Sequence, residues 1–377
     1  MTATLFVPRE RTEGERRVAL VPALVARYRE LGLRLLVETG AGVAAGFPDG
    51  DYADAEIVAD PAWNEADVVV TVRGLAADAA RQLKRGAAVV GLLAPYAEDF
   101  PGAAYGEAGA LAFALEKLPR ISRAQTMDAL SSQAAAAGYH AALLAATTLP
   151  RFFPMLTTAA GTVRPARVLV IGAGVAGLQA IATAHRLGAV VEGYDVRAAA
   201  REQVESLGAR FVDTGVAAEG EGGYARELTA EEKQKQSDIL ARRVAQANAV
   251  ITTAAVPGRP APKILTPAMV ESMAAGSIIV DLAAVSGGNC ELTVPDQAVH
   301  HGGVTILGPT NPAAAVASHA SEMYARNCYN FVAPWFAEKG ALAIPADDEI
   351  YRTAIVAGRL PAPDPASDFA LEQEQQP

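Results

Sequence analysis

The chain has 377 residues, of which 51% are hydrophobic and 20% charged, a composition of folded globular proteins that excludes extensive disorder. At about 150 residues per domain, this length predicts two or three domains. The 42 acidic and 32 basic residues give a formal charge of −10. Since an acidic surface repels phosphate backbones, no nucleic-acid partner is expected. The two cysteines, Cys290 and Cys328, form no CxxC motif, so neither a metal site nor a disulfide framework is expected.

The chain carries no segment that the sequence marks for secretion or for spanning a membrane. No apolar run follows the N-terminal residues, so no signal peptide is predicted. The uncharged stretches 129–150 and 168–184 contain glycine and many alanines, whereas a membrane span needs about 20 strongly apolar residues. Both stretches are therefore predicted to be elements of a soluble fold.

Strands and helices alternate along the N-terminal third. A helix is predicted at 22–31, where Gly32 ends it. The predicted strands cover residues 4–7, 33–38, 66–72 and 87–93. Such alternation predicts a parallel sheet with helices on both faces.

A long helix is predicted at 121–146, and a second alternating run begins at Arg167. Its predicted strands cover residues 167–171, 190–194, 210–212, 249–252, 277–282 and 304–307. An amphipathic stretch at 321–337 is expected to return to the first domain. The fold class is thus α/β, with two doubly wound domains of mainly parallel sheets linked by long helices. The expected domains are 1–127 plus 312–377, and 128–311 including the linking helix.

The strongest local motif is Gly172-Ala-Gly174-Val175-Ala176-Gly177, which follows an apolar strand and opens a predicted helix. In this GxGxxG pattern the first glycine permits a tight turn, the second lets the backbone approach a pyrophosphate, and the third permits close helix packing. The free N–H groups of the helix start then face the phosphates. The motif predicts dinucleotide binding in a Rossmann-like domain. The alternative is a glycine-rich turn without a ligand.

An acidic residue, Asp195, follows Gly172 by 23 residues, at the end of the next predicted strand. Its carboxylate is expected to bind the ribose 2′-OH and to repel a 2′-phosphate, which favours NAD over NADP. Val196 and Arg197 come next, and they are included in the predicted nucleotide site. The Arg197 guanidinium has two interpretations, a phosphate ligand or an ordinary ion-pair residue.

Three further segments are candidates for a functional site. The polar segment with Arg120, Gln125, Asp128 and Ser131 precedes the long helix, where Asp128 or Ser131 alternatively caps that helix. A glycine-rich segment ends in Gly223-Tyr224, which predicts either a lid over a ligand or a surface loop.

The third segment starts at Thr253-Ala254-Ala255, directly after a predicted strand. Ligands of such folds bind at the carboxyl ends of the strands, so these residues are predicted to contact the nucleotide. Residues 281–290 follow another strand at the same edge, and Cys290 is expected to be a buried, inert thiol. No acid–base pair stands out, although most redox reactions of C–O or C–N bonds need a proton relay.

Together these residues resemble the family of alanine dehydrogenases and of the NAD(H)-binding component of proton-translocating nicotinamide nucleotide transhydrogenases. The resemblance rests on segments 125–139, 172–180 and 252–262 and on Gly287-Gly288-Asn289-Cys290. Its most specific portion is the segment RISRAQTMDALSSQA, which begins at Arg120.

The resemblance implies that a hydride passes between NAD(H) on this chain and NADP(H) on a partner subunit. Membrane-spanning subunits would couple that transfer to proton movement. Direct transfer requires the two rings to lie about 3–3.5 Å apart and needs no proton relay. Gln125, Asp128, Ser131 and Arg120 match the residues at the nicotinamide end, Asp195 matches the ribose ligand, and Gly223 and Tyr224 match a mobile loop.

The resemblance also implies a homodimer in the cytoplasm, attached to the inner membrane through its partner subunits. The chain ends at Pro377 without an apolar span, which is expected of a split enzyme whose first component is separate. Two other functions stay open, an amino-acid dehydrogenase and a non-catalytic NAD-binding module. Alanine dehydrogenases use a Lys, a His and an Asp where this chain has Thr71, Leu92 and Val285, which disfavours the dehydrogenase.

Overall fold

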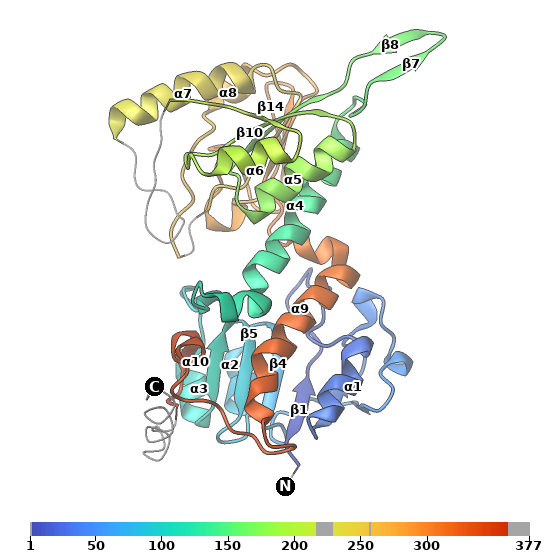
Figure 1. Cartoon of the computed structure of the whole chain (residues 1–377), viewed down its shortest axis with the longest axis vertical. Helices are drawn as coiled ribbons and strands as arrows, with labels where there is room; N and C mark the ends of the chain where they lie inside the picture. Colours follow the sequence, from blue (N-terminus) through green and yellow to red (C-terminus); the bar gives the residue numbers. More distant parts are fainter. Residues whose placement is uncertain (1, 216–228, 256–257, 361–377) are drawn as a thin grey trace, which may run out of the picture. The chain divides into compact units, whose positions relative to one another are not determined.

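The computed structural model describes residues 2–215, 229–255 and 258–360. The chain forms two compact units, one from the described residues of Met1–Gln133 and Val316–Pro377, the other from those of Ala134–Ala315. Each unit contains a seven-stranded sheet with helices packed against it (Figure 1). The predicted α/β class with mainly parallel sheets is confirmed.

The first sheet has the strand order β16-β6-β5-β4-β1-β2-β3, and only β16 runs antiparallel to its neighbour. Its strands are β1 (Thr4–Val7), β2 (Arg34–Glu38), β3 (Glu56–Val58), β4 (Val68–Arg73), β5 (Ala88–Leu92), β6 (Leu111–Ala114) and β16 (Ile355–Ala357). The helices of this unit are α1 (Pro22–Glu30), α2 (Ala77–Arg81), α3 (Gly102–Ala108), α9 (Ala317–Val332) and α10 (Glu349–Ala354).

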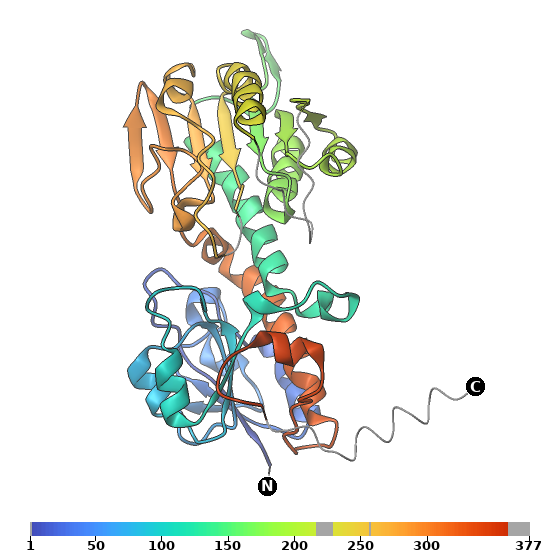
Figure 2. The same ribbon diagram turned by 90° about the vertical axis from the view of Figure 1, so that its left-hand side faces the viewer.

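Both faces of the first sheet are buried, because successive apolar side chains of a strand point to opposite faces. Val70 joins the core beneath α1 and α9, whereas Val69 joins the core beneath α2 and α3 (Figures 1 and 2). The aromatic stripe of α9 packs into the first core, where the Phe331 ring centroid lies 5.5 Å from that of Trp335. The stretch expected to return to this domain is therefore part of its core.

The second sheet has the order β11-β10-β9-β12-β13-β15-β14 and is parallel except for β14. Its strands are β9 (Arg167–Ile171), β10 (Val190–Tyr194), β11 (Arg210–Phe211), β12 (Ala249–Thr252), β13 (Ile278–Asp281), β14 (Ala298–His301) and β15 (Val304–Leu307). Its helices are α5 (Val175–Arg186), α6 (Ala200–Ser206), α7 (Ala230–Val244) and α8 (Pro267–Glu271). The strand order reverses between β9 and β12, and such a switch point is where open α/β sheets bind ligands.

The helix predicted at 121–146 is shorter at its start than expected. Residues Ser122–Met127 form a 3-10 helix, and α4 (Ala129–Thr148) begins only after Asp128. Asp128 has φ −70° and ψ 86°, which is not helical, so it separates the two segments. Further along α4, a Cβ atom on Gly138 would lie 2.0 Å from the carbonyl oxygen of Ala176, so this glycine permits close packing on α5.

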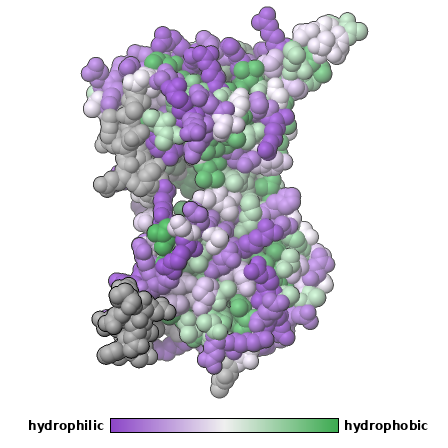
Figure 3. Space-filling model, viewed as in Figure 1, coloured by the Kyte–Doolittle hydropathy of each residue, from purple (hydrophilic) through white to green (hydrophobic). Residues whose placement is uncertain are grey.

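Several short strands were not predicted from the sequence. Strands β3, β6, β14 and β16 have three or four residues each, too few to show a period. A hairpin of β7 (Leu156–Thr158) and β8 (Gly161–Val163) also projects from the second unit with both strands exposed (Figures 1 and 3). Within the described ranges, no helix is long and apolar enough to cross a membrane.

Candidate functional site

The glycine motif forms a tight turn between β9 and α5. Gly172 has φ 98°, a left-handed conformation that favours glycine. A Cβ atom on Gly177 would lie 1.8 Å from the carbonyl oxygen of Gly172, so the third glycine is required for packing. A Cβ atom on Gly174 would meet nothing within 4 Å, and no side chain caps α5 at this residue. The second glycine therefore borders open space at the start of a helix, where a phosphate can approach the backbone.

Asp195 lies directly beside this turn and is buried. Its Oδ2 accepts hydrogen bonds from the Ala173 amide at 2.7 Å and from Arg197 Nη2 at 2.8 Å. Its Oδ1 accepts from the amide and Nε of Arg197 at 2.9 and 2.8 Å. Burial by itself would raise the pKa of Asp195, but these hydrogen bonds outweigh burial and hold the pKa below its usual value. Arg197 is thus an ion-pair residue in this structure.

A cavity of about 200 Å³ opens next to Asp195, at the carboxyl ends of β10 and β11. Arg201 forms an ion pair with Asp213 at its edge and stacks over the Phe211 ring, 4.9 Å from the ring centroid. The lining residues are Asp195, Val196, Ala198, Arg201, Phe211, Asp213, Thr214 and Gly215. Of these, only Asp195 and Val196 were predicted from the sequence, because β11 has two residues and carries little pattern.

The segment after β12 is brought against the glycine turn. The Thr253 amide donates to the carbonyl oxygen of Ile171 at 2.8 Å, and its hydroxyl donates to the carbonyl oxygen of Gly172 at 3.0 Å. Ala254 and Ala255 follow, and the Ala254 backbone is bound by the side chain of buried Asn289. The structure therefore groups the glycine turn, Asp195 and residues 253–255 at one edge of the second sheet. Asn289 was not among the predicted site residues.

The residues expected at the nicotinamide end belong to the first unit. Asp128 caps α4, since its Oδ1 accepts the Ser131 amide at 2.9 Å and its Oδ2 accepts the Ser131 hydroxyl at 2.5 Å. Gln125 is exposed in the 3-10 helix, which α9 holds through Asn327, whose Nδ2 donates to the Thr126 carbonyl oxygen at 2.9 Å. Capping, one of the two interpretations of Asp128, is confirmed and leaves its other expected role untouched.

Two predicted residues, Gly223 and Tyr224, lie outside the described residues. The exposed Arg120 is described and follows β6 by a short connection. It completes the group that the resemblance assigns to the nicotinamide end.

The first unit contains a cluster of buried ionic groups at the ends of its strands. Arg17 binds Glu15 with two bonds, Nε to Oε1 at 2.8 Å and Nη2 to Oε2 at 2.6 Å. Arg73 Nε adds a bond to Glu15 Oε2 at 3.0 Å. A cation therefore does lie at the end of β4, two residues beyond Thr71, so comparing Thr71 alone was misleading. Leu92 and Val285, by contrast, are apolar and offer no group that carries a proton.

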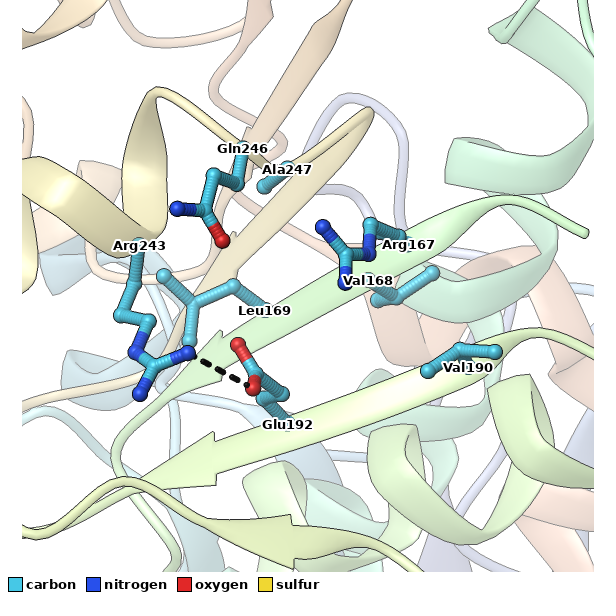
Figure 4. Close-up of a pocket in the computed structure, with 8 residues that line it drawn as sticks. All are labelled: Arg167, Val168, Leu169, Val190, Glu192, Arg243, Gln246 and Ala247. Carbon is cyan, nitrogen blue, oxygen red and sulfur yellow. Dashed lines mark hydrogen bonds and ion pairs between the residues drawn. The ribbon is translucent and has the colours of Figure 1, made fainter.

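A second, smaller cavity of about 20 Å³ lies at the opposite, amino-terminal edge of the second sheet (Figure 4). Arg243 Nη1 pairs with Glu192 Oε1 across it at 3.3 Å. The cavity holds a water molecule at most. It is therefore too small for a nucleotide, and the site at the carboxyl edge stays the candidate.

Family models match most of the chain. The N-terminal domain of alanine dehydrogenase/PNT matches residues 6–137, and the C-terminal domain of alanine dehydrogenase/PNT matches residues 141–359. The chain belongs to the alanine dehydrogenase/PNT family. The family resemblance inferred from the sequence is confirmed.

Individual relatives agree with this family. A protein from Rhodospirillum rubrum, named as the first portion of a divided NAD(P) transhydrogenase subunit alpha, is 46% identical over 343 residues, which are 88% of this chain and 89% of that protein. The crystal structure of transhydrogenase from Sinorhizobium meliloti superposes with a TM-score of 0.86 at 42% identity, covering 94% of this chain and 98% of the other. Alanine dehydrogenase from Bacillus subtilis is 30% identical over 364 residues, 93% of this chain and 89% of the enzyme.

Proposed function

We propose that this chain is the NAD(H)-binding subunit of a proton-translocating NAD(P) transhydrogenase. The observation that carries the proposal is the glycine turn of the second unit, which combines open space at Gly174 with an uncapped start of α5. The family supports it, because a relative named for NAD(P) transhydrogenase subunit alpha is 46% identical and an alanine dehydrogenase is 30% identical. The chain is then an oxidoreductase component.

The residues at the carboxyl edge of the second sheet fit a dinucleotide. The backbone N–H groups of Val175, Ala176 and Gly177 lie in the first turn of α5, where the helix dipole favours the pyrophosphate. Asp195 and Val196 border the cavity and would hold the adenosine ribose. Since Arg197 already occupies the Asp195 carboxylate, the ribose hydroxyls must share or displace its hydrogen bonds. The acidic group favours NAD(H) on this chain over NADP(H).

The resemblance carries the remaining roles. Gln125, Arg120, Asp128 and Ser131 would orient the nicotinamide, and Thr253, Ala254 and Ala255 would line the nucleotide, with Gly223 and Tyr224 closing on it. Bound NADH supplies a hydride, and direct transfer to a second nicotinamide requires no proton at the reacting atoms. The apolar Leu92 and Val285 suit that reaction, because water and proton donors are not needed there.

The partners follow from the same proposal. An NADP(H)-binding subunit would supply the acceptor, and membrane-spanning subunits would couple the transfer to proton movement. The chain would act as a homodimer at the cytoplasmic side of the inner membrane, held there by these subunits. A non-catalytic NAD-binding module would share the nucleotide site but would not transfer a hydride.

The test is hydride transfer from NADH to an NADP+ analogue, measured with and without the purified NADP(H)-binding subunit. Transfer only in the presence of that subunit supports the proposal. Pyruvate with ammonium, offered without the partner, is the control acceptor, and its turnover would make the chain an alanine dehydrogenase. Binding of NADH without transfer under any condition would make it a binding module.

A substitution sharpens this test. Gln125→Asn shortens an exposed side chain by one methylene, so we expect slower hydride transfer, roughly 10-fold or more, with NADH affinity nearly unchanged. Gln246→Asn is the matched control, since Gln246 lies at the opposite edge of the second sheet. A normal rate in the Gln125 variant would remove this residue from the nicotinamide site.

A further inference from the structure

Asn289 connects the two ends of the segment that follows β12. Its side chain is fully buried. Its Oδ1 accepts the Ala254 amide at 3.0 Å, and its Nδ2 donates to the carbonyl oxygens of Ala254 at 2.7 Å and Pro262 at 2.9 Å. One amide side chain therefore fixes both backbone polar groups of Ala254 and joins them to Pro262, eight residues further on.

The position of Asn289 is itself fixed by its neighbours. Its carbonyl oxygen accepts the amides of Ile264 and Leu265 at 2.8 and 3.0 Å. The next residue, Cys290, donates its amide to Oδ2 of Asp281 at 3.0 Å. Asp281 is fully buried and also accepts from the hydroxyls of Thr252 and Thr293 and from the Ala283 amide. A buried polar network in which every member is bound is rigid, so Asn289 can impose its geometry on the segment it holds.

The residue that Asn289 holds lies against the glycine turn. Ala254 follows Thr253, whose hydroxyl donates to the Gly172 carbonyl oxygen at 3.0 Å. A Cβ atom on Gly172 would lie only 3.1 Å from the Ala254 amide nitrogen. A rotation of the Ala254 peptide would therefore change the wall beside the turn on which the pyrophosphate is proposed to bind.

We propose that Asn289 is a positioning residue for the dinucleotide, acting through the Ala254 peptide rather than by touching the ligand. The inference rests on the proposed function, since it assumes that NADH binds at the glycine turn. The position requires one acceptor and two donors in a planar group. Asparagine supplies all three, whereas aspartate supplies only acceptors and would face two carbonyl oxygens.

The test compares Asn289→Asp with Asn248→Ala in the full chain. Asn248 is a matched control, because its Oδ1 accepts the Arg167 amide at 2.9 Å at the opposite edge of the same sheet. The measurements are the dissociation constant for NADH, the melting temperature without nucleotide, and kcat and KM with the partner subunit. We expect the Asn289 variant to bind NADH about 10-fold more weakly, with KM raised far more than kcat is lowered. The control should melt earlier and bind NADH normally.

A purely structural role for Asn289 would lower the melting temperature in both variants and leave NADH affinity unchanged in both, which would overturn the inference. If Asn289→Asp does not fold, the pair Asn289→Ser and Asn248→Ser decides by the same comparison, because serine keeps one hydrogen bond and leaves room for water. Failure of the proposed function is distinguishable, since the unmodified chain would then bind no NADH or transfer no hydride. Weak NADH binding in the Asn289 variant still supports the inference when transfer alone fails.

Discussion

Two buried glutamates in the first unit have opposite electrostatic environments. Glu10 accepts hydrogen bonds from the Thr71 hydroxyl at 2.9 Å and from the amides of Val72 and Arg73 at 2.6 and 3.2 Å, but no cation contacts it in those bonds. Burial therefore raises the pKa of Glu10 to about 7. Glu15 is also buried, but its hydrogen bonds and attraction to Arg17 outweigh burial and lower its pKa to about 2. The same side chain thus has two protonation behaviours, set by the presence of a guanidinium.

The stability of the first unit should depend on pH through Glu10. In the unfolded chain the pKa is 4.5, so between 4.5 and about 7 the folded state holds the proton and the unfolded state does not. The free energy of unfolding therefore falls as pH rises through this window, by roughly 1–3 kcal/mol. Glu10→Gln keeps an acceptor for the two shorter bonds but cannot ionise, so this decrease should disappear. Urea denaturation at about pH 5 and about pH 8 measures it.

Glu15 acts in the opposite direction and does not confuse the test. Its pKa is lowered, so its stabilisation is present above 4.5 and is lost as pH falls toward 2. Both measurements lie above that range. An equal decrease from the lower to the higher pH in the unmodified chain and in Glu10→Gln would contradict the assignment of Glu10.

At the scale of elements, the turn between β9 and α5 assigns different tasks to glycines that look equivalent in the motif. Gly177 faces the Gly172 carbonyl oxygen, so its missing side chain serves packing. Gly174 has φ −77°, a value that any residue adopts, and its Cβ direction is open. Its missing side chain therefore serves the approach of a ligand, and the two tasks can be separated by substitution.

Gly174→Ala and Gly177→Ala form a matched pair. We expect Gly174→Ala to keep its melting temperature and to bind NADH at least about 10-fold more weakly, because the methyl group occupies the space of the pyrophosphate. We expect Gly177→Ala to lose roughly 2 kcal/mol or more of unfolding free energy, because α5 must move away from the turn. Thermal unfolding and NADH titration of both variants measure this. Normal NADH binding by a stable Gly174→Ala variant would refute a pyrophosphate at the turn.

At the scale of the whole molecule, the chain builds separate apolar cores for its two units. Phe331, Trp335, Tyr351 and Phe113 pack ring against ring in the first unit, with centroids 5.0–6.5 Å apart. In the second unit Leu240 and Val244 of α7 are fully buried against the sheet. The candidate dinucleotide residues at the glycine turn and after β12 all lie in the second unit. Ligand stabilisation and core stability can therefore be assigned to different regions of the chain.

Calorimetry should resolve two unfolding transitions. Phe331→Ala should lower one of them by roughly 3–5 kcal/mol, because it removes a fully buried ring. NADH at about 100 times its dissociation constant should raise the other by about 2.7 kcal/mol, since a ligand stabilises the unit that binds it. Leu240→Ala is the control and should lower the transition that NADH raises. A single transition that responds to all three changes would show that the cores unfold together.

The sequence by itself determined the elements with strong, local signals. The bounds of β1, β9, β10, β12 and β15 agree with those predicted, because buried parallel strands are short apolar runs ended by turn residues. The glycine turn was predictable for a similar reason, since steric demands on three glycines leave a fixed spacing. Asp195 followed from its distance to that turn.

Only the tertiary structure decided the features that depend on distant partners. The break at Asp128, the short edge strands and the pairing of Arg197 with Asp195 each depend on backbone geometry or on a neighbour that no periodicity reveals. Asn289 binds Ala254 from 35 residues away, and Glu10 binds Val72 from 62 residues away. A sequence pattern reports the faces of single elements, whereas buried polar groups are satisfied wherever the fold brings a partner, and so their roles appear only when the chain is folded.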